Sequence, residues 1–334
     1  MRTPGFWLTQ ERTLLSRLLS PVAWLYSSIA ARRLKKHPTQ VSVPVICIGN
    51  FTAGGAGKTP TTIAICEMLK AKGEKPFFLS RGYGGTETGP TLVKPEHHTS
   101  QMVGDEPLIL AKHAPVIISQ DRIKGAEFAE AHGATVIIMD DGMQNPYLAK
   151  DLTIAVIDGQ TGLGNGLSIP AGPLRMAMKH QWPLADIIFI LGEGKAGQQI
   201  AETAIAKGKP VYAATVKPDQ NTIEQLQQRP ALAFAGIGRP EKFFNTLRDN
   251  GVRLIKGIPF PDHHDFTDAE LNELLSEAQK LDVLLVTTEK DYIRLKSADL
   301  KAKITMLPVS LSFTGHKPDP LILDFILRKS HPES

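Results

Sequence analysis

The feature that constrains the fold most is a glycine-rich loop between a short apolar run and a helical stretch. The run Val43–Ile48 is apolar and β-branched, Thr59–Lys72 has helical composition, and the loop between them ends in Gly57-Lys58-Thr59. Small residues let successive backbone N–H groups converge on phosphate oxygens, and the following helix adds the positive end of its dipole. This strand–loop–helix order is the context that a P-loop requires, so the sequence predicts a phosphate-binding site in an α/β sheet.

Individual residues of the loop have predicted roles in binding the nucleotide and Mg²⁺. Lys58 is expected to reach the β- and γ-phosphates of ATP, and the Thr59 hydroxyl to ligate Mg²⁺. Thr52 stands where the strict pattern has glycine, and Ala53 holds the place of the signature lysine of a P-loop subclass. The predicted nucleotide-binding residues are Thr52, Ala53, Gly54, Gly55, Ala56, Gly57, Lys58 and Thr59. The alternative is a glycine-rich turn that binds no nucleotide.

Two carboxylates, Asp140 and Asp141, end another apolar run that begins at Val136. In a P-loop protein a carboxylate at this place holds Mg²⁺ directly or through water. Successive strand residues point to opposite faces. We therefore expect one aspartate to face the metal and the other to orient a neighbour or cap the next turn. The alternative is that both are solvated turn residues.

Short apolar runs alternate with helical stretches along most of the chain. The predicted strands are Val43–Ile48, Pro76–Leu79, Val116–Ser119, Thr135–Met139, Thr153–Ile157, Ile187–Leu191, Val211–Ala213, Ala231–Ala235, Val283–Thr287 and Ile304–Pro308. The predicted helices are Thr59–Lys72, Glu106–Lys112, Asp121–His132, Glu241–Asn250 and Thr267–Lys280. Continuous apolar strands that alternate with helices predict a P-loop NTPase-like, mostly parallel sheet with helices on both faces, plus a second, smaller α/β domain.

The length of 334 residues suggests about two domains. The polar stretch Lys217–Arg229 is the best boundary between them. We predict an N-terminal helical segment at 1–36, a P-loop core at 37–216, and a smaller domain at 217–300. Residues 301–334 are expected to form a strand and tail that return to the core.

Positive charge is concentrated at the N-terminus. Residues 1–36 hold seven Lys or Arg and one acid, whereas the remaining 298 residues hold 31 basic and 33 acidic side chains. A nucleic-acid-binding body is therefore not expected, and the basic end is typical of a segment that meets an anionic surface. The two cysteines, Cys47 and Cys66, lie in apolar or helical stretches and are expected to be buried thiols in a reducing compartment.

The N-terminal segment combines this charge with apolar and aromatic residues at roughly helical spacing. Its longest uncharged run, Leu18–Ala31, has 14 residues, whereas a spanning helix needs about 20. The densest basic cluster follows the apolar stretch, which is the wrong order for a signal peptide. We predict an amphipathic helix pair in the membrane interface, with Trp7, Trp24 and Tyr26 at headgroup depth. The alternative is an ordinary helix packed on the protein body.

Other polar residues at predicted strand ends are weaker candidates. Asp105 is expected either to cap a helix or to act as a general base, and His263, beside Asp262, could orient such a base. Arg122 begins a helix near the strand ends, where it could bind phosphate. The loop Ser80–Gly85 could cover the substrate, and Thr287–Asp291 could contact the base or form a hinge, although alone it is typical of a charged turn.

Taken together, these motifs resemble the tetraacyldisaccharide 4'-kinase family, the lipid A 4'-kinases of Gram-negative bacteria. The resemblance covers nearly the whole chain and rests on the order of its motifs. They are Gly49–Pro60, Ser80–Gly85, Gly104–Pro107, Asp140–Gln144, Gly164–Gly166, Pro170–Arg175, Asp262–His264 and Thr288–Asp291.

The resemblance implies transfer of the ATP γ-phosphoryl group to the 4'-hydroxyl of an acylated glucosamine disaccharide 1-phosphate. It implies that Asp105 is the base assisted by His263, that Asp140 and Asp141 serve Mg²⁺ and nucleotide, and that Gln144 and Arg175 lie near substrate. Arg122 is counted with these substrate-binding residues because of its position at a helix start near the strand ends. Many relatives have Glu directly after the arginine that corresponds to Arg175, whereas this chain has Met176 at that position. The lipid substrate implies a peripheral, monotopic location on the cytoplasmic face of the inner membrane.

Two other classes of protein stay open at this point. One is a P-loop kinase or ligase of a soluble substrate, which would not need the basic, aromatic N-terminus. The other is a membrane-peripheral nucleotide switch, in which Asp105 and His263 would be structural. The sequence gives no oligomeric state.

Overall fold

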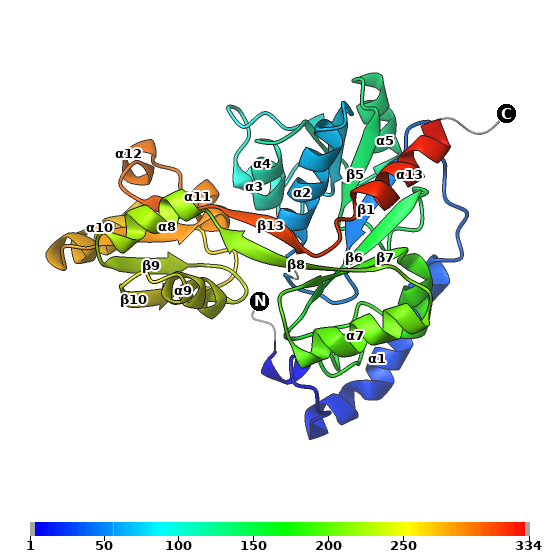
Figure 1. The fold of residues 1–334 in the computed structure, drawn as a ribbon, viewed down its shortest axis with the longest axis horizontal. Coiled ribbons are helices and arrows are strands. Elements are labelled where there is room, and N and C mark those ends of the chain that lie inside the picture. The colour runs from blue at the N-terminus through cyan, green and yellow to red at the C-terminus, as the bar shows by residue number, and fades with distance from the viewer. Residues whose placement is uncertain (1–3, 56, 331–334) are drawn as a thin grey trace.

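The computed structural model describes residues 4–55 and 57–330, with side chains up to residue 326, and contains a large and a small sheet (Figure 1). The strands of the large sheet, in spatial order, are β13 (Val309–Thr314), β8 (Val211–Pro218), β7 (Ile187–Leu191), β6 (Leu152–Asp158), β1 (Val45–Gly49), β5 (Val136–Asp140), β2 (Pro76–Ser80), β4 (Val116–Ile118) and β3 (Thr91–Leu92). Those of the small sheet are β10 (Leu254–Pro259), β9 (Ala231–Ala235), β11 (Leu284–Thr288) and β12 (Thr305–Leu307).

Both sheets are mostly parallel. In the large sheet, β13 runs antiparallel to β8 and β3 antiparallel to β4, and the other pairings are parallel. The pairings of the small sheet are all parallel among the described residues. The predicted α/β class is confirmed.

Helices cover both faces of each sheet because adjacent strand residues point to opposite sides. On the large sheet, Ile46 and Ile48 share a core with α2 (Lys58–Lys70), α4 (Asp105–Leu110) and α13 (Asp319–Ser330), whereas Val45 and Cys47 pack with α5 (Arg122–Ala131) and α7 (Lys195–Ala206). On the small sheet, α8 (Gln220–Gln227) and α9 (Pro240–Asp249) share one core, and α10 (Asp268–Lys280) and α12 (Ala298–Lys301) the other. The remaining short helices are η1 (Gly5–Trp7), α3 (Ser100–Val103), α6 (Met178–Gln181), η2 (Trp182–Leu184) and α11 (Glu289–Arg294).

The register of the large sheet brings the predicted motifs to one edge. Strand β1 lies between β5 and β6, and Ile48 pairs with Asp140. The carboxyl ends of these parallel strands therefore meet, which places the glycine-rich loop after β1 beside Asp140, the last residue of β5, and Asp141, which follows it. Open α/β sheets bind their ligands at such an edge.

An antiparallel ribbon connects the two sheets. Strand β8 leaves the large sheet for α8, and β13 returns alongside it, as Figure 1 shows. Within the predicted C-terminal segment 301–334, the expected strand at Ile304–Pro308 corresponds to β12, which pairs with β11 in the small sheet, and it is β13 that returns to the large sheet. The polar stretch chosen as a boundary contains the amphipathic helix α8, whose Ile223 and Leu226 are buried. The division into domains stays a prediction.

The N-terminal segment forms η1 and a single long helix, α1 (Leu14–Arg33), rather than a pair of helices. Pro21 lies inside α1, and the buried residues are the small Ser16, Ala23 and Ser27. The large apolar side chains of the helix face outward; they are Leu14, Leu15, Leu18, Val22, Trp24, Leu25, Tyr26 and Ile29. Among the described residues, α1 is the one helix long and apolar enough to cross a membrane by length and composition.

Candidate active site

The loop after β1 is held in shape by the segment that ends at Arg175. The Ala53 N–H donates to the Pro173 carbonyl at 2.7 Å, and Thr52 forms a bridge with Leu174. The Ala53 amide is therefore already paired, which leaves the predicted phosphate contacts to residues 54–59. Gly57 has a φ of 83°, and a Cβ there would lie 2.5 Å from Leu191 Cδ1, so the turn into α2 requires glycine. Ala56, also predicted to bind nucleotide, lies outside the described residues.

A strand-end cluster of charges, made of Lys58, Asp140, Asp141, Arg175 and Arg122, lies beside this loop. Asp141 Oδ1 is 3.7 Å from Lys58 Nζ, and Asp141 Oδ2 is 2.7 Å from Arg175 Nη2. Burial alone would raise the pKa of Asp141, but Lys58 and Arg175 outweigh it and hold that pKa below its usual range. The φ of Asp141 is 52°, a conformation that non-glycine residues seldom adopt and that is concentrated at functional sites.

Asp140 differs from its neighbour because no cation in the described part of the chain forms an ion pair with it. Burial raises its pKa to about 7, and the charges of Glu106 and Asp141 add to the effect. Its buried Oδ1 has no hydrogen-bond partner among the described residues. An unpaired carboxylate oxygen at this place fits an Mg²⁺ ion, which in nucleotide sites takes one or two carboxylates together with phosphate and water. The described residues contain no cluster of three or more metal-binding side chains.

Two predicted substrate residues are already engaged in protein contacts. Arg122 is buried, and its Nη1 donates to the Ser119 carbonyl at 3.2 Å. Burial lowers the pKa of Arg122 to about 10, against the opposing effect of Asp140. Gln144 Nε2 donates to the Asn50 carbonyl and to Gln181 Oε1, both at 2.9 Å. Both side chains therefore brace the strand ends, and their contact with substrate stays a prediction.

A second cluster, the dyad cluster, consists of Asp105, His263, Arg294 and Asp291. His263 Nδ1 lies 2.8 Å from Asp105 Oδ2, and Arg294 Nε donates to the same oxygen at 2.8 Å. Asp105 begins α4 on the large sheet, whereas His263 follows β10 of the small sheet and Arg294 ends α11. The predicted Asp105–His263 contact is present, and it joins residues 158 positions apart.

The surroundings of Asp105 favour its ionised form. Burial alone would raise its pKa, but hydrogen bonds from His263 and Arg294 lower it below the usual value. His263 has a φ of 59°, so this residue, like Asp141, holds an uncommon backbone conformation.

The ion pair between Glu106 and Lys290 lies between the two clusters. Glu106 Oε1 is 2.6 Å from Lys290 Nζ, and each residue adjoins a member of the dyad cluster in sequence. Burial would raise the pKa of Glu106, but Lys290 and then Lys58 of the strand-end cluster lower it. The loop lysine and the Asp105–His263 pair are therefore parts of one charged site that spans both sheets.

Sequence reasoning missed Arg294 and Glu106. Both stand next to residues that it singled out: Glu106 follows Asp105, and Arg294 lies one helical turn after Asp291. The available signal for Arg294 was the i,i+3 spacing of an acidic and a basic side chain, Asp291 and Arg294, just after a predicted strand end. Met176, where many relatives have an acid, is buried, and its carbonyl accepts a hydrogen bond from Gln181 Nε2 at 2.7 Å.

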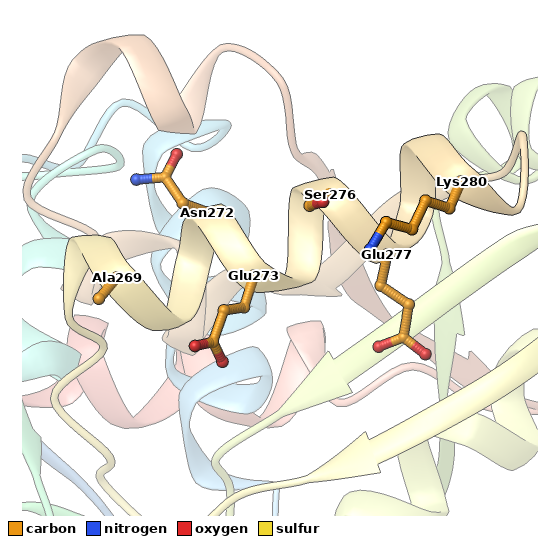
Figure 2. Close-up of a pocket in the computed structure, with 6 residues that line it drawn as sticks. All are labelled: Ala269, Asn272, Glu273, Ser276, Glu277 and Lys280. Atoms are coloured by element: carbon orange, nitrogen blue, oxygen red, sulfur yellow. The ribbon is translucent and has the colours of Figure 1, made fainter.

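A surface hollow lies away from these clusters. Figure 2 shows six residues that line it, all of them on α10. None of them belongs to either cluster, so the hollow is not part of the candidate site.

Comparison with known proteins identifies the family. Residues 15–327 match the family model of tetraacyldisaccharide-1-P 4'-kinase. A tetraacyldisaccharide 4'-kinase from Methylobacterium nodulans is 49% identical over 97% of this chain and 94% of its own length, and one from Bradyrhizobium sp. (strain ORS 278) is 48% identical over 89% of this chain and 88% of its own length. The crystal structure of LpxK from Aquifex aeolicus in complex with ATP is similar, with a TM-score of 0.75 and 27% identity over 94% of this chain and 100% of that one.

These matches confirm the resemblance, the enzyme class and the predicted use of ATP with Mg²⁺. The family is associated with the inner membrane. The chain therefore belongs to the tetraacyldisaccharide-1-P 4'-kinase family, and it is an ATP-dependent phosphotransferase of lipid A biosynthesis that acts on a hydroxyl group.

Proposed function

We propose that the strand-end cluster and the dyad cluster act together to transfer the γ-phosphoryl group of ATP to the 4'-hydroxyl of an acylated glucosamine disaccharide 1-phosphate. The observation that carries this assignment of residues is the 2.8 Å contact between Asp105 and His263. The Glu106–Lys290 ion pair links this contact to the strand-end cluster, because Glu106 follows Asp105 in sequence and the charge of Lys58 lowers its pKa. The names of the relatives state a tetraacylated disaccharide and its 4' position, and the name of the family adds the 1-phosphate.

The strand-end cluster serves the nucleotide. The backbone of Gly54 and Gly55 and of Gly57–Thr59 cradles the phosphates, and Lys58 neutralises charge on the γ-phosphoryl oxygens. Thr59 and Asp140 are suited to hold Mg²⁺, since the Asp140 oxygen is buried and unpaired. When bound, Mg²⁺ offsets the negative charge of the phosphates. Asp141 positions Lys58 and Arg175, because its two oxygens face these two cations.

The dyad cluster serves the acceptor. Phosphoryl transfer passes through a loose transition state, so the protein contributes mainly by positioning and charge compensation. Asp105 and His263 remove the proton of the acceptor hydroxyl as the new bond forms. The two sheets must be docked for this pair to exist, because each supplies one member.

The outer face of α1 serves the membrane. Its Ser16, Ala23 and Ser27 are turned toward the protein, and Ser27 Oγ accepts a hydrogen bond from the Ala177 N–H at 2.8 Å. The inner face of α1 is therefore occupied, which favours a helix lying in the interface on the cytoplasmic side over one that crosses the bilayer. Arg32 and Arg33 in its last turn would meet lipid phosphates.

The proposed function is tested with ATP, Mg²⁺ and a lipid disaccharide 1-phosphate in mixed micelles. We expect a phosphorylated lipid and ADP in equal amounts, with little ADP when the lipid is omitted. ADP release that does not depend on the lipid would favour the nucleotide switch, and transfer to soluble sugars alone would favour the soluble-substrate kinase.

The membrane role is tested in the full chain by flotation with anionic phospholipid vesicles. The double change Leu18→Asp and Leu25→Asp should release the protein from the vesicles, because both side chains are exposed on α1. Ile205→Asp, at an exposed apolar position on α7, is the matched control and should leave binding unchanged. Equal vesicle binding by all three proteins would contradict the role of α1.

A further inference from the structure

Arg294 is the most heavily bonded side chain of the dyad cluster, and the roles proposed above leave it unused. Its side chain is 4% exposed. Its Nε donates to Asp105 Oδ2 at 2.8 Å, and its Nη2 lies 2.7 Å from the same oxygen and 3.4 Å from His263 Nδ1. One guanidinium thus contacts both members of the dyad.

The other end of the guanidinium is fixed to the small sheet. Its Nη1 donates to the Gly236 carbonyl at 2.9 Å and to Asp291 Oδ1 at 2.8 Å. Asp291 Oδ1 also accepts the Gly236 N–H at 3.0 Å, and the His263 N–H donates to the Gly236 carbonyl at 3.0 Å. Arg294 and His263 are therefore held by the same carbonyl at the end of β9, which sets their positions relative to each other.

The contacts with Asp105 all fall on one oxygen. His263 and Arg294 both meet Oδ2, and no described residue donates to Oδ1. A planar guanidinium can meet one carboxylate with Nε and Nη2 while Nη1 bonds elsewhere, which a lysine ammonium cannot reproduce. The arrangement fixes the orientation of the carboxylate and leaves Oδ1 for another partner.

We propose that Arg294 is a positioning residue for phosphoryl transfer, which keeps the Asp105 carboxylate aligned with His263 when the two sheets are docked. This inference rests on the proposed function of the dyad. In the step, the acceptor O–H bond breaks and its proton passes to the dyad, while its oxygen forms the new bond to the γ-phosphorus. The bond from that phosphorus to the bridging oxygen breaks, and ADP leaves.

Several charged groups face the dyad. Glu106 lies on α4, Lys290 and Asp291 lie on α11 with Arg294, and Asp262 Oδ1 is 3.9 Å from His263 Nε2. Lys290 is paired with Glu106 and Asp291 with Arg294. Removing the Arg294 cation therefore leaves a net gain of negative charge around Asp105, which favours protonation of the dyad.

The test compares Arg294→Met and Arg294→Lys with the parent enzyme in the lipid kinase assay across pH. We expect the acidic limb of kcat/KM to move up by about 1–3 pH units in Arg294→Met, the shift that a nearby opposite charge imposes on an aspartate. Arg294→Lys keeps the positive charge, so its acidic limb of kcat/KM should shift less than that of Arg294→Met. Its kcat should still fall, because the alignment of the Asp105 carboxylate with His263 is lost. KM for ATP should stay within about twofold in both, since only transition-state interactions are removed.

Lys112→Met is the matched control. It removes another ion pair between the same two parts of the molecule, that of Lys112 with Glu289 at 2.8 Å, without touching Asp105. Its pH profile should match that of the parent. If Lys112→Met reproduces the Arg294 effects, then Arg294 acts only through docking and the inference is wrong.

A double-mutant cycle separates this inference from the proposed function. In an Asp105→Asn background, Arg294→Met should lower kcat by less than about twofold, because the two residues act as one unit. Near-normal turnover of Asp105→Asn itself would refute the proposed dyad. An inactive Asp105→Asn together with an unshifted, fully active Arg294→Met would refute the role of Arg294 alone. Circular dichroism melting identifies variants that fail to fold, and Arg294→Lys then carries the test.

Discussion

The two charged clusters of the site differ in how they are built. Lys58 and Asp140 follow β1 and β5, which pair directly in one parallel sheet. Asp105, in contrast, meets His263 and Arg294 across two sheets, over 158 and 189 residues of sequence. The nucleotide side of the site therefore depends on the register of one sheet, whereas the acceptor side depends on the docking of two.

This difference gives the two clusters separate roles in kinetics. A change in the strand-end cluster should weaken ATP binding and transfer together. A change in the dyad cluster should lower turnover and leave ATP binding almost intact.

The largest effect is expected for Lys58→Ala. This change removes the cation that the site aims at the phosphates and leaves Asp141 Oδ1 without its ion pair. We expect kcat/KM to fall about a thousandfold, the upper range for loss of one charge-stabilising donor. Steady-state kinetics and the ATP dissociation constant measure it. A loss below tenfold would mean that another group neutralises the γ-phosphoryl charge.

A smaller effect, confined to turnover, is expected for Asp105→Asn. The amide cannot accept the acceptor proton, so kcat should fall about a hundredfold, as is typical for loss of a general base. The ATP dissociation constant should change little, because Asp105 belongs to the other cluster. Thermal melting serves as the control for folding, since the change removes one of the two carboxylates that pair with buried Arg294 and leaves it only Asp291. Equal weakening of ATP binding and turnover would contradict the separation of the clusters.

The smallest effect on chemistry, but a measurable one on stability, is expected for Asp158→Asn. Asp158 ends β6 and pairs with Arg239 and Lys242 of the small sheet, a second docking contact outside the dyad. Burial would raise its pKa, but the hydrogen bond from Arg239 outweighs it and lowers the pKa to about 2. A shift of this size corresponds to about 2 kcal/mol of folding free energy at neutral pH.

The sign of the pH dependence follows from that depressed pKa. The stabilisation is present above the ordinary aspartate pKa of 3.8 and is lost as the pH falls towards about 2. Urea unfolding should therefore show a deficit of about 2 kcal/mol for Asp158→Asn at pH 7 that shrinks below pH 4. Glu277→Gln, which breaks the exposed pair with Lys256, is the control and should cost under about 1 kcal/mol. A constant deficit from pH 7 to pH 3 would argue against the ion pair.

The same contrast explains how much could be predicted from sequence. Local patterns predicted the parallel sheets and four members of the strand-end cluster, because apolar runs, glycines, strand-end carboxylates and a helix start can be recognised from neighbouring residues. The fifth member, Arg175, was expected only from the family resemblance. Strand β10 was missed because it lies at an edge and is largely exposed, and α7 because it contains Gly197. A Cβ at Gly197 would lie 2.7 Å from Gly159 Cα, so packing overrides the low helix propensity of glycine there.

The acceptor side could not be derived from spacing. The pairing of Asp105 with His263 was expected only from the family resemblance, since nothing local brings residues of two sheets together. Arg294 was missed for the same reason: its contacts with Asp105, His263 and Gly236 are tertiary. A short helix after a strand, with Asp291 three residues earlier, gave no sign of which carboxylate the arginine would meet.

The most direct test of the account is His263→Ala, because His263 is the dyad member that the small sheet supplies and it lies half-exposed. The ATP dissociation constant and the single-turnover rate of lipid phosphorylation are measured on the same preparation. We expect an unchanged ATP dissociation constant and a transfer rate at least about tenfold lower. An unchanged transfer rate would contradict the claim that docking of the two sheets completes the acceptor side of the site.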